Sequence, residues 1–303
     1  MTDYSHLHSS TVPLLDLSNA ERVFRCQTKR YVNYPRAKQI MAKLEHLLVL
    51  PHQQRPECLI VEAPTSNGKS YLLKEFLRRH PAVDDPKGDS GIIPVLFIEV
   101  TGDPSLETFY EWILDALSVP FNRKSHRRIK RHQCILALKM AGTRIVIMDE
   151  THNLALASFA ERMKILAEMR SIMNDDTLMI SFVCAGTGQA KSQLQSDAQL
   201  LNRHEVAQLP LWKDDGDYRA LLAGFESLLP LRQPSGLWED DALAGYILER
   251  SERLIAGMFY IVSRAATEAI RSGEERITRK ILERVDYQPP SKRRVTVVDL
   301  DVM

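Results

Sequence analysis

The chain has 303 residues, 44% of them hydrophobic and 26% charged, and its formal net charge is +1 at pH 7. Such a chain can bury a sizeable core, and its length suggests one large domain with a smaller one. The four cysteines are scattered without a CxxC pair, which argues against a zinc site. No apolar run is long enough to span a bilayer, and the polar first 16 residues are not a signal peptide, which argues against a membrane protein and a secreted protein. We therefore expect a soluble intracellular protein.

The N-terminal residues show little periodicity and are predicted to form an arm over residues 1–30. Within this arm, Ser18 is followed three residues later by Glu21, which is the pattern that caps a short helix. A longer helix is predicted over residues 34–50, because apolar residues recur there at helical spacing and Pro51 follows them.

From residue 58 onwards, short apolar runs alternate with longer amphipathic runs. Near-continuous apolar strands separated by helices are typical of a parallel sheet with helices on both faces. We therefore expect an α/β fold built on a parallel five-stranded sheet. The predicted strands cover residues 58–62, 93–100, 144–148, 177–184 and 205–211. Helices are predicted over residues 69–79, 106–117 and 159–174, and a further helix includes the basic residues 123–132 and continues to residue 140.

After Trp212 the strands stop and only helical patterns remain, over residues 218–229, 240–251, 255–272 and 278–284. They predict a separate small helical domain. The tail from Tyr287 contains two prolines and a basic run, so we expect it to be mobile. The expected organisation is an arm over residues 1–30, an α/β domain over residues 31–212, a helical lid domain over residues 213–286 and a basic, flexible tail over residues 287–303.

A phosphate-binding loop is predicted between the first strand and the helix that follows it. Residues 63–70 match the pattern G-x-x-x-x-G-K-[ST], except that Ala63 replaces the first glycine; Ala63 can serve if its φ stays negative. Converging N–H groups and the positive helix end favour phosphate there, although a chance Gly-Lys-Ser turn is the alternative. Lys69 is expected to reach the β- and γ-phosphates of ATP, and Ser70 to ligate Mg²⁺. The predicted nucleotide contacts are Pro64, Thr65, Ser66, Asn67, Gly68, Lys69, Ser70 and Tyr71.

An acidic pair, Asp149 and Glu150, ends the third predicted strand. The carboxyl end of a buried strand is where α/β sheets bind ligands. Asp149 is expected to hold Mg²⁺ through water, and Glu150 to polarise the attacking water. A helix cap formed by Asp149 is the alternative. Because the loop and the acidic pair occur in the order that an ATPase requires, we favour an ATP-hydrolysing site.

Two further residues are candidates for that site. Thr187 follows the fourth strand and carries a hydroxyl that can sense the γ-phosphate, although the neighbouring glycines fit a plain turn equally well. Arg203 precedes the fifth strand, and an arginine there can stabilise transition-state charge in a neighbouring subunit's site. On local sequence alone, a solvated surface arginine is the more common interpretation.

A basic cluster without any acid lies between residues 123 and 132. On a helix, Arg127 and Arg131 lie one turn apart on one face. Such a face contacts phosphates without reading bases, and the lack of interleaved aromatic residues favours a duplex over a single strand. A solvated helix face is the alternative interpretation. The predicted DNA-binding residues are Lys124, Arg127, Arg128, Lys130 and Arg131.

Several stretches of the chain, taken together, resemble the TniB family of transposition ATPases, which is related to TnsC and more distantly to MuB. The resemblance runs from about Tyr31 to Ile277. The most specific stretches are Asp-Glu-Thr-His at 149–152, Leu-Pro-Leu-Trp at 209–212 and Leu-Pro-Leu-Arg-Gln-Pro-Ser at 229–235, beside Tyr-Pro-Arg at 34–36.

The resemblance implies an AAA+ P-loop NTPase that is encoded by a bacterial mobile element and is nucleoid-associated in the cytoplasm. Its relatives bind target DNA, assemble as oligomers or filaments with ATP and recruit a DDE transposase, which here would be TniA-like; a TniQ-type targeting protein is a further partner. On this resemblance Thr187 takes the sensor-1 role and Arg203 becomes an arginine finger that completes a shared ATP site in trans.

Two positions depart from related AAA+ proteins. Ala63 replaces a glycine, and the segment Gly-Met-Phe-Tyr at 257–260 lacks the arginine of a sensor-2 pattern, for which Arg253 is the nearest substitute. We therefore expect slow hydrolysis that depends on assembly. The alternatives are a signalling, STAND-like ATPase that contacts only proteins, and a small-molecule P-loop kinase; the basic cluster and the helical domain argue against the kinase.

Overall fold

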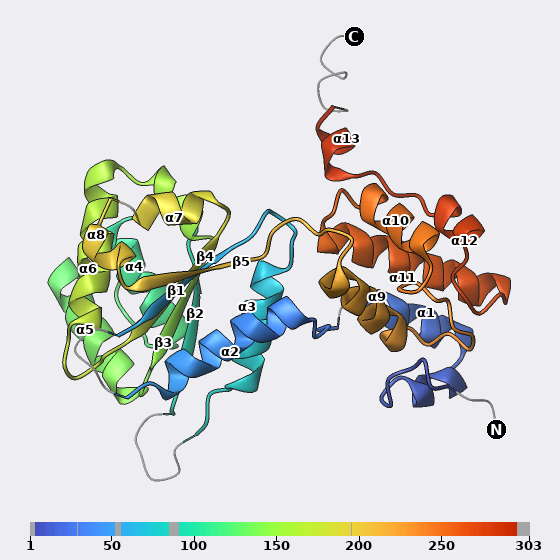
Figure 1. Cartoon of the computed structure of the whole chain (residues 1–303). Coiled ribbons are helices and arrows are strands. Elements are labelled where there is room, and N and C mark those ends of the chain that lie inside the picture. Colours follow the sequence, from blue (N-terminus) through green and yellow to red (C-terminus); the bar gives the residue numbers. More distant parts are fainter. Residues whose placement is uncertain (1–3, 29, 52–55, 85–90, 195, 296–303) are drawn as a thin grey trace. The chain divides into compact units, whose positions relative to one another are not determined.

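The computed structural model describes residues 4–28, 30–51, 56–84, 91–194 and 196–295. The chain divides into two compact units, Gln39–Pro210 and a second unit that combines Met1–Lys38 with Leu211–Met303 (Figure 1). The N-terminal segment is therefore part of the helical unit, where the sequence suggested a separate arm. No helix in the described part of the chain is long and apolar enough to cross a membrane.

The first unit contains the predicted α/β fold with a parallel five-stranded sheet (Figure 1). Its strands lie in the order β2-β3-β4-β1-β5, and every neighbouring pair is parallel. Because β1 lies between β4 and β5, the chain crosses over the sheet between strands, and the carboxyl ends of all five strands meet at one edge. The strands are β1 (Cys58–Glu62), β2 (Val95–Glu99), β3 (Ile145–Asp149), β4 (Ser181–Gly186) and β5 (His204–Gln208).

Only β1 has both boundaries as predicted, and the two largest differences, at the start of β4 and the end of β5, have local reasons. β4 begins at Ser181 because Leu178 and Met179 donate their N–H groups to the carbonyl of Asp175, and Met179 has a φ of +49°. These bonds form a turn that continues the preceding helix. β5 ends at Gln208, and Leu209 makes one more bond to the carbonyl of Glu62 before Pro210, which has no N–H to donate.

Helices cover both faces of the sheet. α4 (Leu106–Ala116), α5 (Arg127–Met140) and α6 (Phe159–Met173) form one buried core with β2, β3 and β4. α3 (Lys69–Arg79) contacts β2 and β4 from the other face, and α2 (Pro35–Val49) lies beside α3, where His80 and Glu45 approach to 2.9 Å. The shorter helices η2 (Thr151–Leu156), α7 (Gln189–Leu194) and α8 (Ala198–Leu201) follow β3 and β4.

The second unit is helical. It contains η1 (Val12–Asp16), α1 (Asn19–Gln27), α9 (Gly216–Leu228), α10 (Asp241–Arg250), α11 (Ile255–Ser272), α12 (Arg279–Arg284) and α13 (Pro290–Val295) (Figure 1). The predicted cap of α1 is confirmed, because Ser18 and Glu21 form a reciprocal capping box. The tail that the sequence predicts to be mobile includes α13, and the remaining tail residues, 296–303, lie outside the described residues.

A buried arginine explains why α1 belongs to the helical unit. The side chain of Arg22 is fully buried and donates to the carbonyl of Pro230, with its Nη2 at 2.7 Å, and to both carboxylate oxygens of Glu275. These partners lie more than 200 residues away in the sequence. In the same unit, the rings of Tyr34 and Trp212 pack edge to face at 4.8 Å, which joins two of the stretches that carry the family resemblance.

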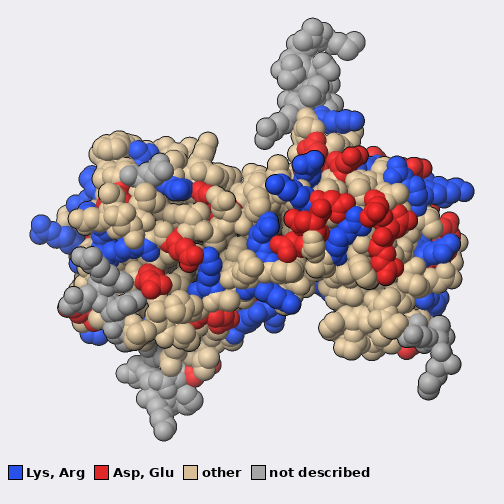
Figure 2. Space-filling model, in the orientation of Figure 1, with Lys and Arg blue, Asp and Glu red and all other residues tan. Residues whose placement is uncertain are grey.

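On the face seen in Figure 2, Lys and Arg side chains are interspersed with Asp and Glu side chains on each unit. This mixture agrees with the formal net charge of +1. No large positive region covers this face.

Candidate nucleotide site and basic cluster

The predicted site residues Lys69, Asp149, Glu150 and Thr187 come together at the carboxyl edge of the sheet. The phosphate loop follows β1, the acidic pair ends β3, and Thr187 follows β4, which lies between these two strands. The register aligns Glu62 of β1 with Gly186 of β4, and the N–H of Ala63 donates to the carbonyl of Gly186 at 3.0 Å. The parallel topology thus assembles the site from segments that lie far apart in the sequence.

The phosphate loop has a backbone that depends on two left-handed residues. Gly68 caps α3 with a φ of +88°, a conformation that a residue with a Cβ adopts only with strain. Ser66 has a φ of +63°, so this serine carries strain of about 1–2 kcal/mol. Ala63 is not among the described residues with positive φ, and its methyl group is therefore compatible with the loop. Alanine was expected to replace glycine here only if its φ stays negative, and this condition is met.

Asn67 fixes the loop to the sheet. Its side chain is buried, and Nδ2 donates to the carbonyls of Leu209 and Pro210, each at 2.9 Å. The amide side chain is thus directed toward the end of β5. The sequence predicts Asn67 only as a nucleotide contact. Its hydrogen bonds to the end of β5 could not be predicted locally, because β5 lies far along the chain.

Lys69 lies between the two acids. Its side chain is buried, and Nζ lies 3.0 Å from Oδ1 of Asp149 and 3.0 Å from Oε1 of Glu150. An ammonium group shared by two carboxylates is held at the point where the loop, the start of α3 and the acidic pair meet. The same ammonium group is suited to a polyphosphate chain, which would replace the carboxylates as its anionic partner.

Glu150 is held in an uncommon backbone conformation. Its φ and ψ are 55° and 33°, in the left-handed region, and its N–H donates to Oδ1 of Asp149 at 2.8 Å. Such strain concentrates at functional sites. Oε2 of Glu150 lies 3.2 Å from Nδ1 of His152. His152 in turn packs against Gly186, where an added Cβ would lie only 3.2 Å from Nδ1. No role was predicted for His152, although it follows Glu150 by only two residues in the sequence.

These residues fit a nucleotide with its magnesium ion. The first N–H groups of α3 have no partner within the helix, and they follow a loop whose left-handed Gly68 lets the backbone approach a phosphate closely. The hydroxyl of Ser70 and the carboxylate of Asp149 are oxygen ligands of the kind that Mg²⁺ prefers. Asp149 would hold the ion with Ser70, Lys69 would contact the phosphates, and the ion would neutralise phosphate charge.

Thr187 lies directly after β4, between the strands that carry the loop and the acidic pair. Its carbonyl accepts from the N–H of Ala190 at 2.7 Å, which begins α7. This position suits a hydroxyl that contacts a γ-phosphate, and the sensor-1 role stays a prediction.

Arg203 lies at the opposite edge of the sheet from the phosphate loop. Its carbonyl accepts from the N–H of Cys58, the first residue of β1, about 13 Å along the strand from Glu62. Nη1 of Arg203 is buried and has no hydrogen-bond partner among the described residues. A catalytic role for Arg203 stays a prediction. Arg253, the substitute for sensor 2, is an exposed residue of the helical unit, and that role also stays a prediction.

Lys130 is a correction to the predicted DNA-binding residues. Its side chain is fully buried, and Nζ donates to Oε1 of Glu107 at 2.6 Å, Oε1 of Glu111 at 2.7 Å and the carbonyl of Arg123 at 2.7 Å. Lys130, Cys134 and Leu138 are the buried residues of α5, four residues apart, so Lys130 faces α4 and is not available to a phosphate.

The other predicted cations remain at or near the surface. Lys124, Arg127 and Arg128 are exposed at the start of α5, where His126 caps the helix by accepting from the N–H of Arg128. Arg131 is half-exposed, and its guanidinium bonds to Oε1 of Glu168 at 2.8 Å and to Oγ of Ser171 at 3.0 Å. A polar hollow lies beside Lys124 and Arg127, and Glu107 and Glu161 are among its lining residues. The cluster is therefore smaller than its sequence suggests.

Several solved structures share this fold. The ORC2 protein of Aeropyrum pernix, in its ADPNP–ADP complexes, matches with a TM-score of 0.57 and 15% identity over 86% of this chain and 70% of that chain. CDC6P of Pyrobaculum aerophilum matches with a TM-score of 0.59 and 16% identity over 86% and 68%. The A. pernix ORC1 protein in complex with DNA matches with a TM-score of 0.57 and 13% identity over 90% and 69%.

At these identities the likeness shows the fold, which is the AAA+ P-loop fold expected from the sequence. No curated protein sequence matches the chain. A protein-family model described as "Bacterial TniB protein" matches residues 22–214.

Proposed function

Because this chain belongs to the TniB family, we propose that it is an ATP-dependent, DNA-binding regulator of transposition. It assembles on target DNA with ATP bound and recruits or activates a DDE transposase of the TniA kind, with a TniQ-type targeting protein as a further partner. ATP hydrolysis then drives disassembly. The observation that carries this proposal is the position of Lys69 between Asp149 and Glu150, at the end of an AAA+ sheet.

In the proposed hydrolysis each residue of that site has a separate role. Lys69 contacts the β- and γ-phosphates, Asp149 and Ser70 hold Mg²⁺, and Glu150 orients and polarises the attacking water. Glu150 is the partly exposed member of the acidic pair and Asp149 the buried one, which suits a base that meets water and a ligand that holds an ion. Thr187 contacts the γ-phosphate and reports its presence.

Assembly is proposed to complete the site. Arg203 lies at the edge of the sheet opposite its own phosphate loop, so it acts on the nucleotide of a neighbouring subunit. A site that needs a second subunit hydrolyses slowly until subunits meet. This behaviour suits a timer on DNA, because ATP holds the assembly and turnover releases it.

The DNA contact is proposed to be the start of α5. Lys124, Arg127 and Arg128 present three exposed cations there, and Arg131 adds a fourth that is shared with Glu168. Two similar structures are described as bound to DNA, the A. pernix ORC1 protein and Drosophila ORC, which supports the use of this fold on DNA. Contacts of this kind bind the backbone and read no sequence.

A salt titration of duplex binding in the presence of ATP tests the DNA contact. Backbone binding predicts that log K falls with log salt at about 0.9 units per phosphate contacted. Exchange of Arg127, Arg128 and Arg131 for alanine should lower the slope by about 2–3 units and weaken binding to all sequences equally. Exchange of Lys43, Lys74 and Arg78 for alanine, which are cations on α2 and α3 of the same unit, removes the same charge and serves as the control. An unchanged slope in the first variant would show that the cluster does not contact DNA.

A further inference from the structure

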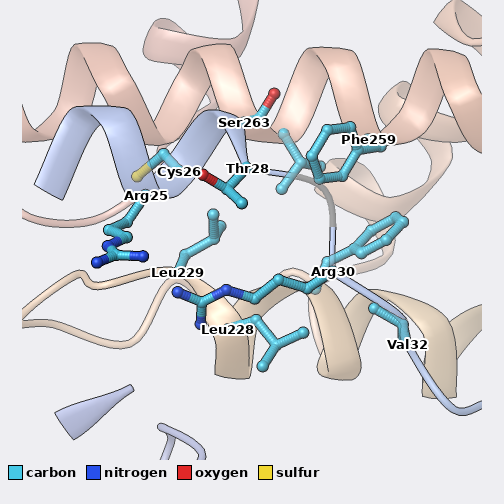
Figure 3. A pocket seen from close by; sticks show the side chains of 11 residues that line it. Arg25, Cys26, Thr28, Arg30, Val32, Leu228, Leu229, Phe259 and Ser263 are labelled. Atoms are coloured by element: carbon cyan, nitrogen blue, oxygen red, sulfur yellow. The ribbon is translucent and has the colours of Figure 1, made fainter. Parts of the chain in front are cut away.

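The helical unit contains a hollow between α1, α9 and α11, which Val32, Phe225 and Phe259 help to line (Figure 3). Its volume of about 20 Å³ has room for about one water molecule and for no ligand. The hollow therefore offers no binding site. A polar group that still needs a partner lies instead in the α/β unit, beside the candidate nucleotide site.

The second carboxylate oxygen of Glu150 faces a histidine. Oε1 of Glu150 lies 3.0 Å from Nζ of Lys69, and Oε2 lies 3.2 Å from Nδ1 of His152. Nδ1 is buried but forms no hydrogen bond with any described residue, so the ring and the carboxylate are close without being aligned. A buried nitrogen without a partner costs free energy, and a rotation of the Glu150 carboxylate would give it one.

The position of His152 is fixed by its surroundings on η2. Oγ1 of Thr151 donates to a carbonyl of β3 at 2.7 Å, and Nδ2 of Asn153 donates to the carbonyl that directly follows β2 at 2.8 Å. The ring also packs against Gly186, where an added Cβ would lie 3.2 Å from Nδ1 and 3.3 Å from the backbone nitrogen of His152. The imidazole thus occupies the space that a side chain at Gly186 would need, and the fold holds it beside Glu150.

Lys69 and His152 compete for the same carboxylate. Lys69 holds Oε1 of Glu150 here, with Asp149 as its other partner. In the proposed hydrolysis Lys69 contacts the β- and γ-phosphates, so Glu150 loses its cationic partner at the moment when it has to act. A carboxylate at the end of a flexible side chain has several rotamers, and only one that points at the attacking water serves the reaction. A donor at Nδ1 of His152 can select that rotamer.

We propose that His152 is a positioning residue for Glu150. When Lys69 turns to the phosphates, Nδ1 of His152 donates to Oε2 of Glu150 and fixes the carboxylate for the attacking water. The buried Nδ1 gains its missing partner in this arrangement. A neutral imidazole with its proton on Nδ1 is sufficient, so no change of charge on His152 is required. The inference rests on the proposed hydrolysis and adds one residue to it.

Nitrogen NMR of isotope-labelled histidine rings in the full chain tests the contact without nucleotide. Lys69→Met removes the competing ammonium group, so Glu150 should turn to His152. At pH 8, where an ordinary histidine is neutral, the proton of His152 should then lie on Nδ1 and exchange slowly with water. Addition of Glu150→Ala removes the acceptor and should restore fast exchange. The signal is identified among the nine histidines by its loss in His152→Gln. Equal exchange with and without Glu150 would overturn the proposal.

Steady-state ATP hydrolysis on duplex DNA gives a second measurement. His152→Ala should lower kcat by about tenfold or more and leave KM within about twofold, because a contact that positions the base acts in the transition state. His152→Asn should keep kcat within about threefold of the original chain, since its amide nitrogen takes the place of Nδ1. His152→Gln is the matched control, because its amide lies where Nε2 does, and it should not restore kcat. Full activity of His152→Ala, or equal rescue by Asn and Gln, would contradict the positioning role.

The two measurements separate this inference from the proposed function. If the original chain neither binds the ATP analogue ADPNP nor hydrolyses ATP, the proposed function fails and the role of His152 falls with it. If the original chain hydrolyses ATP and His152→Ala does so at the same kcat, only the role of His152 falls. Should Lys69→Met fail to fold, ADPNP with Mg²⁺ on the original chain replaces it, and the Nδ1 proton of His152 should again exchange slowly; fast exchange there would overturn the proposal.

Discussion

Lys130→Met separates stability from DNA binding within one basic cluster. We expect it to destabilise the α/β unit by about 2–3 kcal/mol, because methionine keeps the buried aliphatic stem but loses three bonds from the ammonium group. Bonds to charged groups contribute about 1.5–3 kcal/mol each. Glu107 is about half-exposed and relaxes into water at little cost, whereas Glu111 is mostly buried and is left without its partner. The expected loss is therefore close to that of one charged bond.

The assay is urea unfolding and thermal melting, set beside duplex binding at a temperature where the variant is folded. The midpoint of melting should fall by about 5–10 °C, given roughly 2–4 °C per kcal/mol for a unit of this size. The salt slope of DNA binding should not change. Lys124→Met, an exposed neighbour, should do the reverse, with stability within about 0.5 kcal/mol of the original chain and a slope lower by about 0.9. A stable Lys130→Met chain with a reduced slope would refute the buried position of Lys130.

Three further predictions follow from the same contacts. Arg22→Met should destabilise the helical unit by about 3–5 kcal/mol in urea, because Glu275 then loses its buried partner; a loss below about 1 kcal/mol would contradict the burial. Burial lowers the pKa of His204 below its ordinary value of 6.5, so below pH 6.5 the unfolded chain binds a proton that the folded chain does not, and stability is lost as the pH falls. His204→Asn should flatten this decline in stability, and an equal decline in the variant would show that His204 is not its source. A mixture of Lys69→Ala and Arg203→Ala chains should hydrolyse ATP where neither does alone, since mixed pairs restore one complete site, and an inactive mixture would argue against action in trans.

The candidate nucleotide site was predictable because its causes are local. Gly68 and Lys69 lie at a strand-to-helix turn, and Asp149 and Glu150 follow a run of buried apolar residues, so each feature can be recognised within ten residues. Parallel strands then bring the two features to the same edge of the sheet. The sheet itself follows from the same apolar runs. The two largest shifts of a strand boundary, at the start of β4 and the end of β5, lie where Asp175 and Glu62 accept additional bonds.

Two buried side chains, Lys130 and Arg22, were not predicted from the sequence. The run of basic residues obscures the buried face of α5 that carries Lys130, and Arg22 depends on partners that are distant in the sequence. Its position within a run of basic residues predicts that Lys130 contacts DNA. However, Cys134 and Leu138 lie on the same face of the helix, and these apolar residues indicate that the face is buried. This signal was available in the sequence. The burial of Arg22 was not, because its partner Pro230 lies in another segment of the chain.

The central claim is that the nucleotide at Lys69 controls residence on DNA, and release from a labelled duplex tests it most directly. The original chain should remain bound with ATP and dissociate as ATP is consumed. Glu150→Gln keeps the ATP site but loses the residue that polarises water, so this variant should stay bound with ATP for many times longer and leave the duplex only when ATP is withdrawn. Release of Glu150→Gln at the original rate with ATP present, or equal residence of the original chain with ATP and with ADP, would contradict the account.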